Sequence, residues 1–172
     1  MIDTNVQTLE EKGRQDKFLQ RDLPVAYLMV RVTMGFHMIA HGAVRLPILS
    51  QFAADTTKSF AGVYLLGLPL FPDWLVTIIC YTIPPVEFVI GLLLAVGFKT
   101  RLASIAGNIM FVVMMFGTVA QKNFATAHVM WWYVLIFAVL GALNFADRYS
   151  LDRMKNIDRQ PTGFSPMRYS FY

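Results

Sequence analysis

Four long apolar runs divide the chain, at residues 23–43, 74–98, 102–120 and 129–146. A helix needs about 20 apolar residues, with a range of about 17 to 25, to cross the hydrocarbon of a bilayer. Helices satisfy their backbone groups internally in lipid, and the runs lack the alternation of barrel strands. The pattern predicts an all-α fold, an integral membrane four-helix bundle over residues 23–147.

The segments outside the runs are polar. Tails of residues 1–22 and 148–172 flank the predicted bundle, and a long connection, 44–73, joins its first two helices. Within that connection, SQFAADTTKSFAGVYLLGLP (50–69) is partly amphipathic. We expect a short helix there, lying on the outer membrane surface.

Composition supports the membrane assignment. Of the 172 residues, 56% are hydrophobic and 15% are charged, whereas roughly 25% are charged in soluble domains. The basic residues flank the apolar runs and do not form one patch with aromatics, so nucleic acid is not an expected partner. The single cysteine, Cys80, lies in an apolar run and is most simply a small buried hydrophobe.

Basic residues orient the predicted bundle. Eleven of the 15 Lys and Arg residues lie in the two tails and in the turn after the second run, three lie on the opposite side, and Arg31 lies within a span. Positive charge is enriched in cytoplasmic segments. Both termini are therefore predicted to be cytoplasmic.

Two charged residues fall inside predicted spans. Counting about 1.5 Å of rise per residue, Arg31 lies about 10 Å and Glu87 about 15 Å from the cytoplasmic end. They are predicted to be within reach of each other if the first two spans are neighbours. The pair is either structural or includes Glu87 as a proton-handling carboxylate; a nearby arginine favours the ionised form unless a substrate separates them. Pro84 and Pro85, one turn earlier, predict a kink.

A second polar group lies towards the outer side, in HMIAHGAVR (37–45). His37 and His41 share a helix face because they are four residues apart, and Arg45 continues that stripe. His128 starts the fourth run, and Trp131 marks its interface. Three interpretations remain open: haem b held by His41 and His128, a quinone or other small molecule held by histidine and arginine, or interfacial side chains without a ligand. We assign no metal ligands.

The order of these motifs resembles the DoxX/DoxD-like family of small four-helix membrane proteins. HG-x-x-R, GLP, VEFVIGLLLAVGFKTRLA and YSLD follow one another between residues 25 and 152. The resemblance places family positions on His41, Gly42, Arg45 and Glu87, and a G-x-x-T-R turn on residues 97–101. The family more often has lysine where Arg45 stands, and His37 and the double proline are not expected of it.

The resemblance implies a multi-pass protein of a bacterial or archaeal plasma membrane, in a redox setting. The DoxD type is a subunit of a thiosulfate:quinone oxidoreductase, which works with a small partner subunit. The leading hypothesis is a quinone-linked oxidoreductase subunit of the respiratory chain, partnered by other redox subunits or a second copy. The alternative is a non-catalytic anchoring subunit of a larger respiratory complex. The candidate catalytic residues are Glu87, His41 and Arg45, and the candidate cofactor-binding residues are Arg31, His37, His128 and Trp131.

Overall fold

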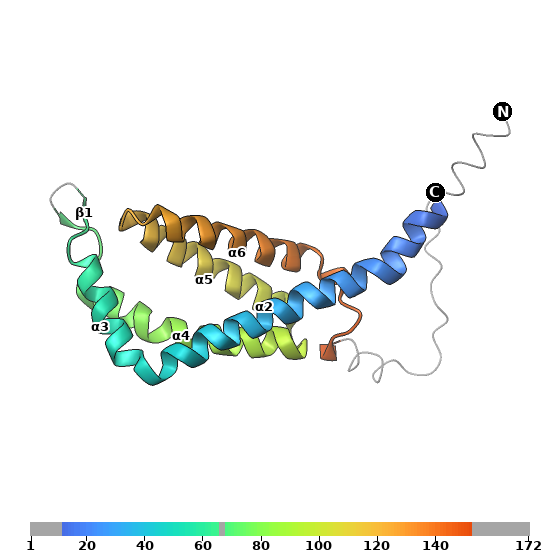
Figure 1. Cartoon of the computed structure of the whole chain (residues 1–172), viewed down its shortest axis with the longest axis horizontal. Helices are drawn as coiled ribbons and strands as arrows, with labels where there is room; N and C mark the ends of the chain where they lie inside the picture. Colours follow the sequence, from blue (N-terminus) through green and yellow to red (C-terminus); the bar gives the residue numbers. More distant parts are fainter. Residues whose placement is uncertain (1–11, 66–67, 153–172) are drawn as a thin grey trace, which may run out of the picture.

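A computed structural model describes residues 12–65 and 68–152 (Figure 1). Residues 12–17 are helical and continue through a π-helix, η1 (Phe18–Asp22), into the first long helix. The main helices are α2 (Leu23–Arg45), α3 (Leu49–Phe60), α4 (Asp73–Val96), α5 (Thr100–Ala120) and α6 (Phe124–Ala142). Short 3-10 segments, η2 (Leu46–Ile48) and η3 (Asn144–Ala146), follow α2 and α6, and β1 (Tyr64–Leu65) pairs with β2 (Leu68–Pro69).

In the part of the chain that the structure describes, four helical segments are long and apolar enough to cross a membrane: Lys12–Phe60, α4, α5 and α6. The predicted all-α, four-helix fold is therefore confirmed. Most of the two predicted tails, residues 1–11 and 153–172, lies outside the described part of the chain.

The bundle is built from two antiparallel helix pairs, α2 with α4 and α5 with α6 (Figure 1). Glycines allow α2 and α4 to pack closely. A Cβ at Gly91 would lie 2.6 Å from the Ile39 nitrogen and 2.7 Å from the Gly35 carbonyl oxygen. Small residues at such contacts drive helix association in lipid, where burial of apolar surface from water is not available.

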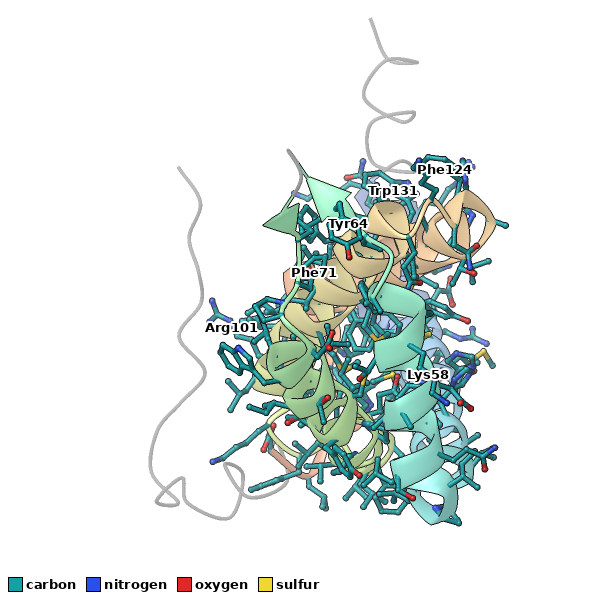
Figure 2. The ribbon with its side chains drawn as sticks, turned by 90° about the vertical axis from the view of Figure 1, so that its left-hand side faces the viewer. Lys58, Tyr64, Phe71, Arg101, Phe124 and Trp131 are labelled. Atoms are coloured by element: carbon teal, nitrogen blue, oxygen red, sulfur yellow. The ribbon has the colours of Figure 1, made fainter. Side chains whose placement is uncertain are left out.

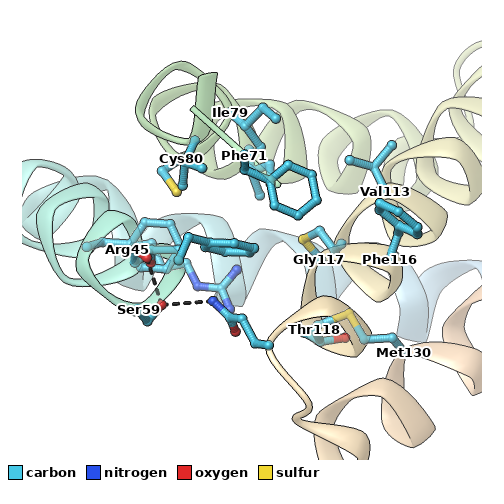
Figure 3. Close-up of a pocket in the computed structure, with 17 residues that line it drawn as sticks. Arg45, Ser59, Phe71, Ile79, Cys80, Val113, Phe116, Gly117, Thr118 and Met130 are labelled. Carbon is cyan, nitrogen blue, oxygen red and sulfur yellow. Dashed lines mark hydrogen bonds between the residues drawn. The ribbon is translucent and has the colours of Figure 1, made fainter. Parts of the chain in front are cut away.

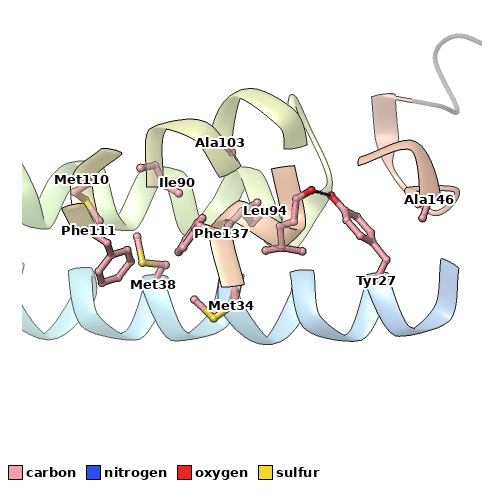
Figure 4. Packing of buried hydrophobic residues seen from close by; sticks show 11 residues of the cluster. Tyr27, Met34, Met38, Ile90, Leu94, Ala103, Met110, Phe111, Phe137 and Ala146 are labelled. Atoms are coloured by element: carbon pink, nitrogen blue, oxygen red, sulfur yellow. Dashed lines mark hydrogen bonds between the residues drawn. The ribbon is translucent and has the colours of Figure 1, made fainter. Parts of the chain in front are cut away.

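An apolar core joins the two pairs (Figure 4). Met34 and Met38 of α2 contribute to a cluster that includes Leu94 of α4 and Phe137 of α6. The Tyr27 hydroxyl donates to the Leu140 carbonyl oxygen at 3.1 Å, which ties the start of α2 to the end of α6. Large apolar side chains also cover the outside of the spans, among them Phe36, Ile78, Ile109 and Val139. Such a surface suits contact with lipid.

Single residues near the ends of α4 and α6 determine where these helices stop and start. Gly97 ends α4 in the left-handed region, with φ of 77°, and the Phe98 amide donates to the Leu93 carbonyl oxygen at 2.9 Å. This is the usual glycine-terminated helix end. Asn123 caps α6, since its side-chain oxygen accepts from the Thr126 amide at 3.2 Å. The fourth helix therefore begins at Phe124 and ends at Ala142, whereas the apolar run had predicted 129–146.

The connection between the first two spans is largely helical. After α2, the chain turns through η2, which contains Pro47, and enters α3. Ala53 of α3 packs with Val76 and Cys80 of α4, and the Thr57 and Thr77 hydroxyl oxygens lie 3.2 Å apart. The short helix expected in this connection is present. It packs along the first half of α4.

Candidate functional site

Glu87 of α4 and Arg45 of α2 form an ion pair inside the bundle. Arg45 Nη1 donates to both carboxylate oxygens of Glu87, at 2.9 Å and 2.8 Å. The Glu87 side chain is 2% exposed, whereas that of Arg45 is 25% exposed. A buried charge needs a partner of this kind, because removal from water is costly. The arginine therefore neutralises Glu87 and keeps part of its own surface open.

Close helix packing brings these two side chains together. A Cβ at Gly42 would lie 2.8 Å from both the Phe88 amide nitrogen and the Pro84 carbonyl oxygen. Only glycine allows this approach, and Arg45 lies three residues further along α2. The Cζ atom of Arg45 also lies 5.2 Å from the centre of the Phe52 ring, within the range of a cation–π contact.

A cavity of about 390 Å³ lies beside the ion pair, between α2, α5 and α6. We call it the histidine cavity. Its volume lies in the range of about 300–1,000 Å³ that is usual for small-molecule sites. It is lined by His37, Met38, His41, Arg45, Glu87, Phe111, Met114, Ala125, Thr126, Val129, Met130 and Tyr133.

A row of rings forms one wall of the histidine cavity. The ring centres of His37 and His41 are 4.4 Å apart, and His37 stacks on Tyr133 at 4.9 Å. Tyr133 stacks in turn on Phe111 at 4.8 Å. The wall therefore combines imidazole nitrogens, which exchange protons and hydrogen bonds, with flat aromatic faces.

A second cavity of about 290 Å³ lies on the other side of Arg45, bounded mainly by α3, α4 and α5 (Figure 3). We call it the phenylalanine cavity. It shares Arg45, Met114 and Met130 with the histidine cavity. Its other lining residues are Phe52, Thr56, Ser59, Phe60, Phe71, Val76, Ile79, Cys80, Ile83, Val113, Phe116, Gly117, Thr118 and Gln121.

Comparison with known proteins identifies the family. The family model described as DoxX matches residues 26–121, more than half of the chain. The chain belongs to the DoxX family. It is a multi-pass membrane protein, since the family is one of membrane proteins and four helices in the described part of the chain have spanning length and composition. No curated protein and no solved structure matches the chain.

The DoxX match covers part of the site. It runs from α2 to the first residue after α5 and includes His41, Arg45, Glu87 and Phe111. It ends before α6, which supplies Tyr133 and Met130 to the histidine cavity. The ion pair thus belongs to the DoxX part of the chain, and only the residues that α6 supplies to the cavity lie outside the match.

The predicted pairing of Arg31 with Glu87 is wrong. Arg31 Nη1 donates to Asp147 Oδ1 at 2.6 Å, and Arg31 Nη2 donates to the Tyr149 carbonyl oxygen at 3.0 Å. A Cβ at Gly97 would lie 2.7 Å from Arg31 Nη1, so Arg31 is level with the end of α4. The depth was misjudged because the helix begins well before Pro24, from which the rise was counted.

Two other candidates are not brought to the histidine cavity. His128 is exposed, and its Nδ1 atom lies 3.0 Å from the carbonyl oxygen of Phe124 in its own helix. Trp131 is 50% exposed and lies on the outside of the bundle (Figure 2). His128 therefore does not join His37 and His41, which share a face of α2 as their spacing predicts.

Sequence reasoning missed two residues that complete these groups. Tyr133 stacks on His37, and its signal was a tyrosine within an otherwise apolar fourth run. Asp147 pairs with Arg31, and its signal was an acidic residue directly after that run. Each lies about 100 residues or more from its partner in α2. Only helix packing sets these distances.

The arrangement allows hydrogen bonding and proton exchange next to an apolar surface. His37 and His41 offer imidazole nitrogens, Arg45 offers N–H donors, and Glu87 offers a carboxylate. Within residues 12–65 and 68–152, no three His, Cys, Asp or Glu side chains are grouped as metal ligands. The side chains that line the cavity can take part in acid–base and hydrogen-bonding chemistry.

Proposed function

We propose that this DoxX-family protein is the membrane subunit of a quinone-linked oxidoreductase, and that a quinone ring binds in the histidine cavity. One observation carries the proposal. A buried carboxylate, Glu87, is held by Arg45 in the wall of a cavity that two histidines and two stacked aromatic rings also line. Such a cavity offers a flat ring one aromatic wall to lie against and hydrogen-bond donors at its edge.

The chemistry of a quinone suits these groups. Its carbonyl oxygens accept hydrogen bonds, and its conversion to the hydroquinone takes up two electrons and two protons. His37, His41 and Arg45 carry the donors, and Tyr133 and Phe111 carry the aromatic faces. His41 and Glu87 act as the proton-holding groups, since a positioned side chain can deliver a proton to the oxygen as charge develops there.

An electron donor is also required. We assign it to an anionic reductant of the thiosulfate type, as in the DoxD-like branch, reacting through a partner subunit. Arg45 supports this assignment, because its guanidinium is partly open and lies between the two cavities. A guanidinium is well suited to oxyanions, since it presents several N–H donors in one plane.

The test is quinone binding by the purified full-length protein in lipid nanodiscs, measured by solvent extraction and by titration of tryptophan fluorescence. We expect bound quinone in the wild type. Glu87→Gln and His41→Ala should each weaken binding by about tenfold or more, equivalent to about 1.4 kcal/mol. The matched controls are Asp55→Asn and His128→Ala, whose side chains are exposed and lie outside the cavity.

The opposite result would support the alternative function. If the protein binds no quinone and instead copurifies with larger redox subunits, it is an anchoring subunit. If His128→Ala weakens binding as much as His41→Ala, the quinone site is not the histidine cavity.

A further inference from the structure

Binding of a quinone ring in the histidine cavity does not account for the phenylalanine cavity, although the two cavities adjoin. Arg45, Met114 and Met130 line both cavities, so no other helix lies between them. Methionine side chains are unbranched and flexible, and they adapt to what they contact. Met114 and Met130 are therefore flexible side chains at the boundary between the two cavities.

The lining of the phenylalanine cavity is suited to hydrocarbon. Phe60 and Phe71 meet edge to face with ring centres 5.3 Å apart, and Phe71 and Phe116 do so at 6.0 Å (Figure 3). The polar lining groups include Ser59 and Gln121, which are hydrogen-bonded to each other at 2.8 Å across α3 and α5. A polar ring would find few open partners here, whereas a hydrocarbon chain would find aromatic and aliphatic surface.

We infer that the two cavities form one bipartite site for an amphiphile: the ring binds in the histidine cavity, and its hydrocarbon tail passes Met114 and Met130 into the phenylalanine cavity. The inference rests on the proposed function and specifies its ligand class. The ligand is a quinone with a long isoprenoid or alkyl tail. The tail is recognised by the protein and does not merely dissolve in the surrounding lipid.

The first measurement compares two ligands on the wild-type protein in nanodiscs. One is a tail-less benzoquinone, and the other carries the same ring with a decyl tail. Because tails also partition into lipid, the informative quantity is the ratio of the two dissociation constants in each variant relative to the wild type. Lipid partitioning is the same for every variant, so it cancels in that comparison.

The second measurement repeats the comparison on variants in which a larger side chain narrows the phenylalanine cavity. Gly117 lines it, and a Cβ there would already lie 3.2 Å from the Phe60 ring, so Gly117→Leu fills space that the tail would occupy. The matched control is Gly141→Leu, where the nearest atom to a Cβ is Ser104 Cβ at 3.9 Å. A second filling variant, Val113→Phe, changes a half-exposed position and keeps the test available if Gly117→Leu does not fold.

We expect Gly117→Leu and Val113→Phe to weaken binding of the tailed quinone by about tenfold or more while the tail-less quinone binds as in the wild type. Gly141→Leu should change neither. If both filling variants leave the tailed quinone unaffected while His41→Ala weakens it, the tail lies elsewhere and the inference fails, although the proposed function stands. If neither quinone binds the wild type, both fail. Copurified phospholipid that Gly117→Leu displaces, without effect on quinone, would also overturn the inference.

Discussion

Two arginines of α2 pair with different carboxylates because they lie at different positions along the helix. Arg31 and Arg45 are fourteen residues apart on α2, and they pair with Asp147 and Glu87 respectively. Asp147 Oδ2 and Arg31 Nε make no hydrogen bond although both atoms are buried. The attraction between Arg31 and Asp147 therefore depends on the one contact from Nη1 to Oδ1. Neither residue lines either cavity.

Loss of Arg31 should destabilise the protein without affecting ligand binding. Arg31→Leu leaves the buried Asp147 carboxylate without its partner, and breaking a buried pair in this way costs about 3–5 kcal/mol. The free energy of unfolding in detergent measures this loss. The matched control is Arg101→Leu, an exposed arginine at the start of α5. The double variant Arg31→Leu/Asp147→Leu should recover much of the lost stability, and equal stability of Arg31→Leu and the control would contradict the pair.

At the scale of helices, close packing of α2 on α4 sets the position of the site. Gly35, Gly42 and Gly91 let the two backbones touch, and the contact carries Arg45 to Glu87. The break at η2 then turns α3 along the first half of α4, where Phe52 and Phe60 line the phenylalanine cavity. One interrupted helical segment thus contributes to both cavities.

Separation of α2 from α4 should weaken the whole site. In Gly91→Ala, the added methyl meets backbone atoms at 2.6 Å and 2.7 Å, which cannot move aside without shifting a helix. Overpacking of this kind costs about 1–3 kcal/mol. We expect a lower thermal midpoint and weaker quinone binding. Gly141→Ala is the control, since a methyl there makes only an ordinary contact with Ser104. Unchanged stability of Gly91→Ala would mean that the helices do not pack this closely.

At the scale of the whole molecule, the charges at the two ends of the bundle are unequal. Lys99 and Arg101 lie at the same end of the bundle as the start of α2. The helical segment that precedes α2 carries further basic residues. Lys58 lies near the end of α3, beside Ser59, which bonds to Gln121 at the end of α5. Positive charge therefore gathers at the end that holds Arg31 and Asp147, and that end is the expected cytoplasmic one.

Cysteine labelling in intact bacterial cells tests this orientation. In a Cys80→Ala background, Lys58→Cys should react with a membrane-impermeant maleimide from outside. Lys99→Cys should react only after the cells are permeabilised. Both lysines are exposed, so access to the side chain itself does not limit the reaction. The reverse pattern would place the termini outside, and labelling of both positions in intact cells would contradict the crossing of α4 between them.

The sequence alone determined the number and approximate positions of the spans and the main candidate residues. Runs of apolar residues long enough to cross lipid predicted four helices, because lipid tolerates few other backbone structures. The spacing of His37, His41 and Arg45 placed them on one face of the first helix, because that relation depends only on 3.6 residues per turn. Residue chemistry at depth also singled out Glu87, since a carboxylate among apolar neighbours needs a partner.

The tertiary structure decided which groups meet. Glu87 joined Arg45 instead of Arg31, Asp147 joined Arg31, and Tyr133 joined His37. These pairings depend on how far each helix slides along its neighbour, and a shift of one turn, about 5.4 Å, exchanges one partner for another. Helix register arises from packing between distant residues, such as Gly91 against Ile39, and the apolar pattern of each helix by itself does not contain it.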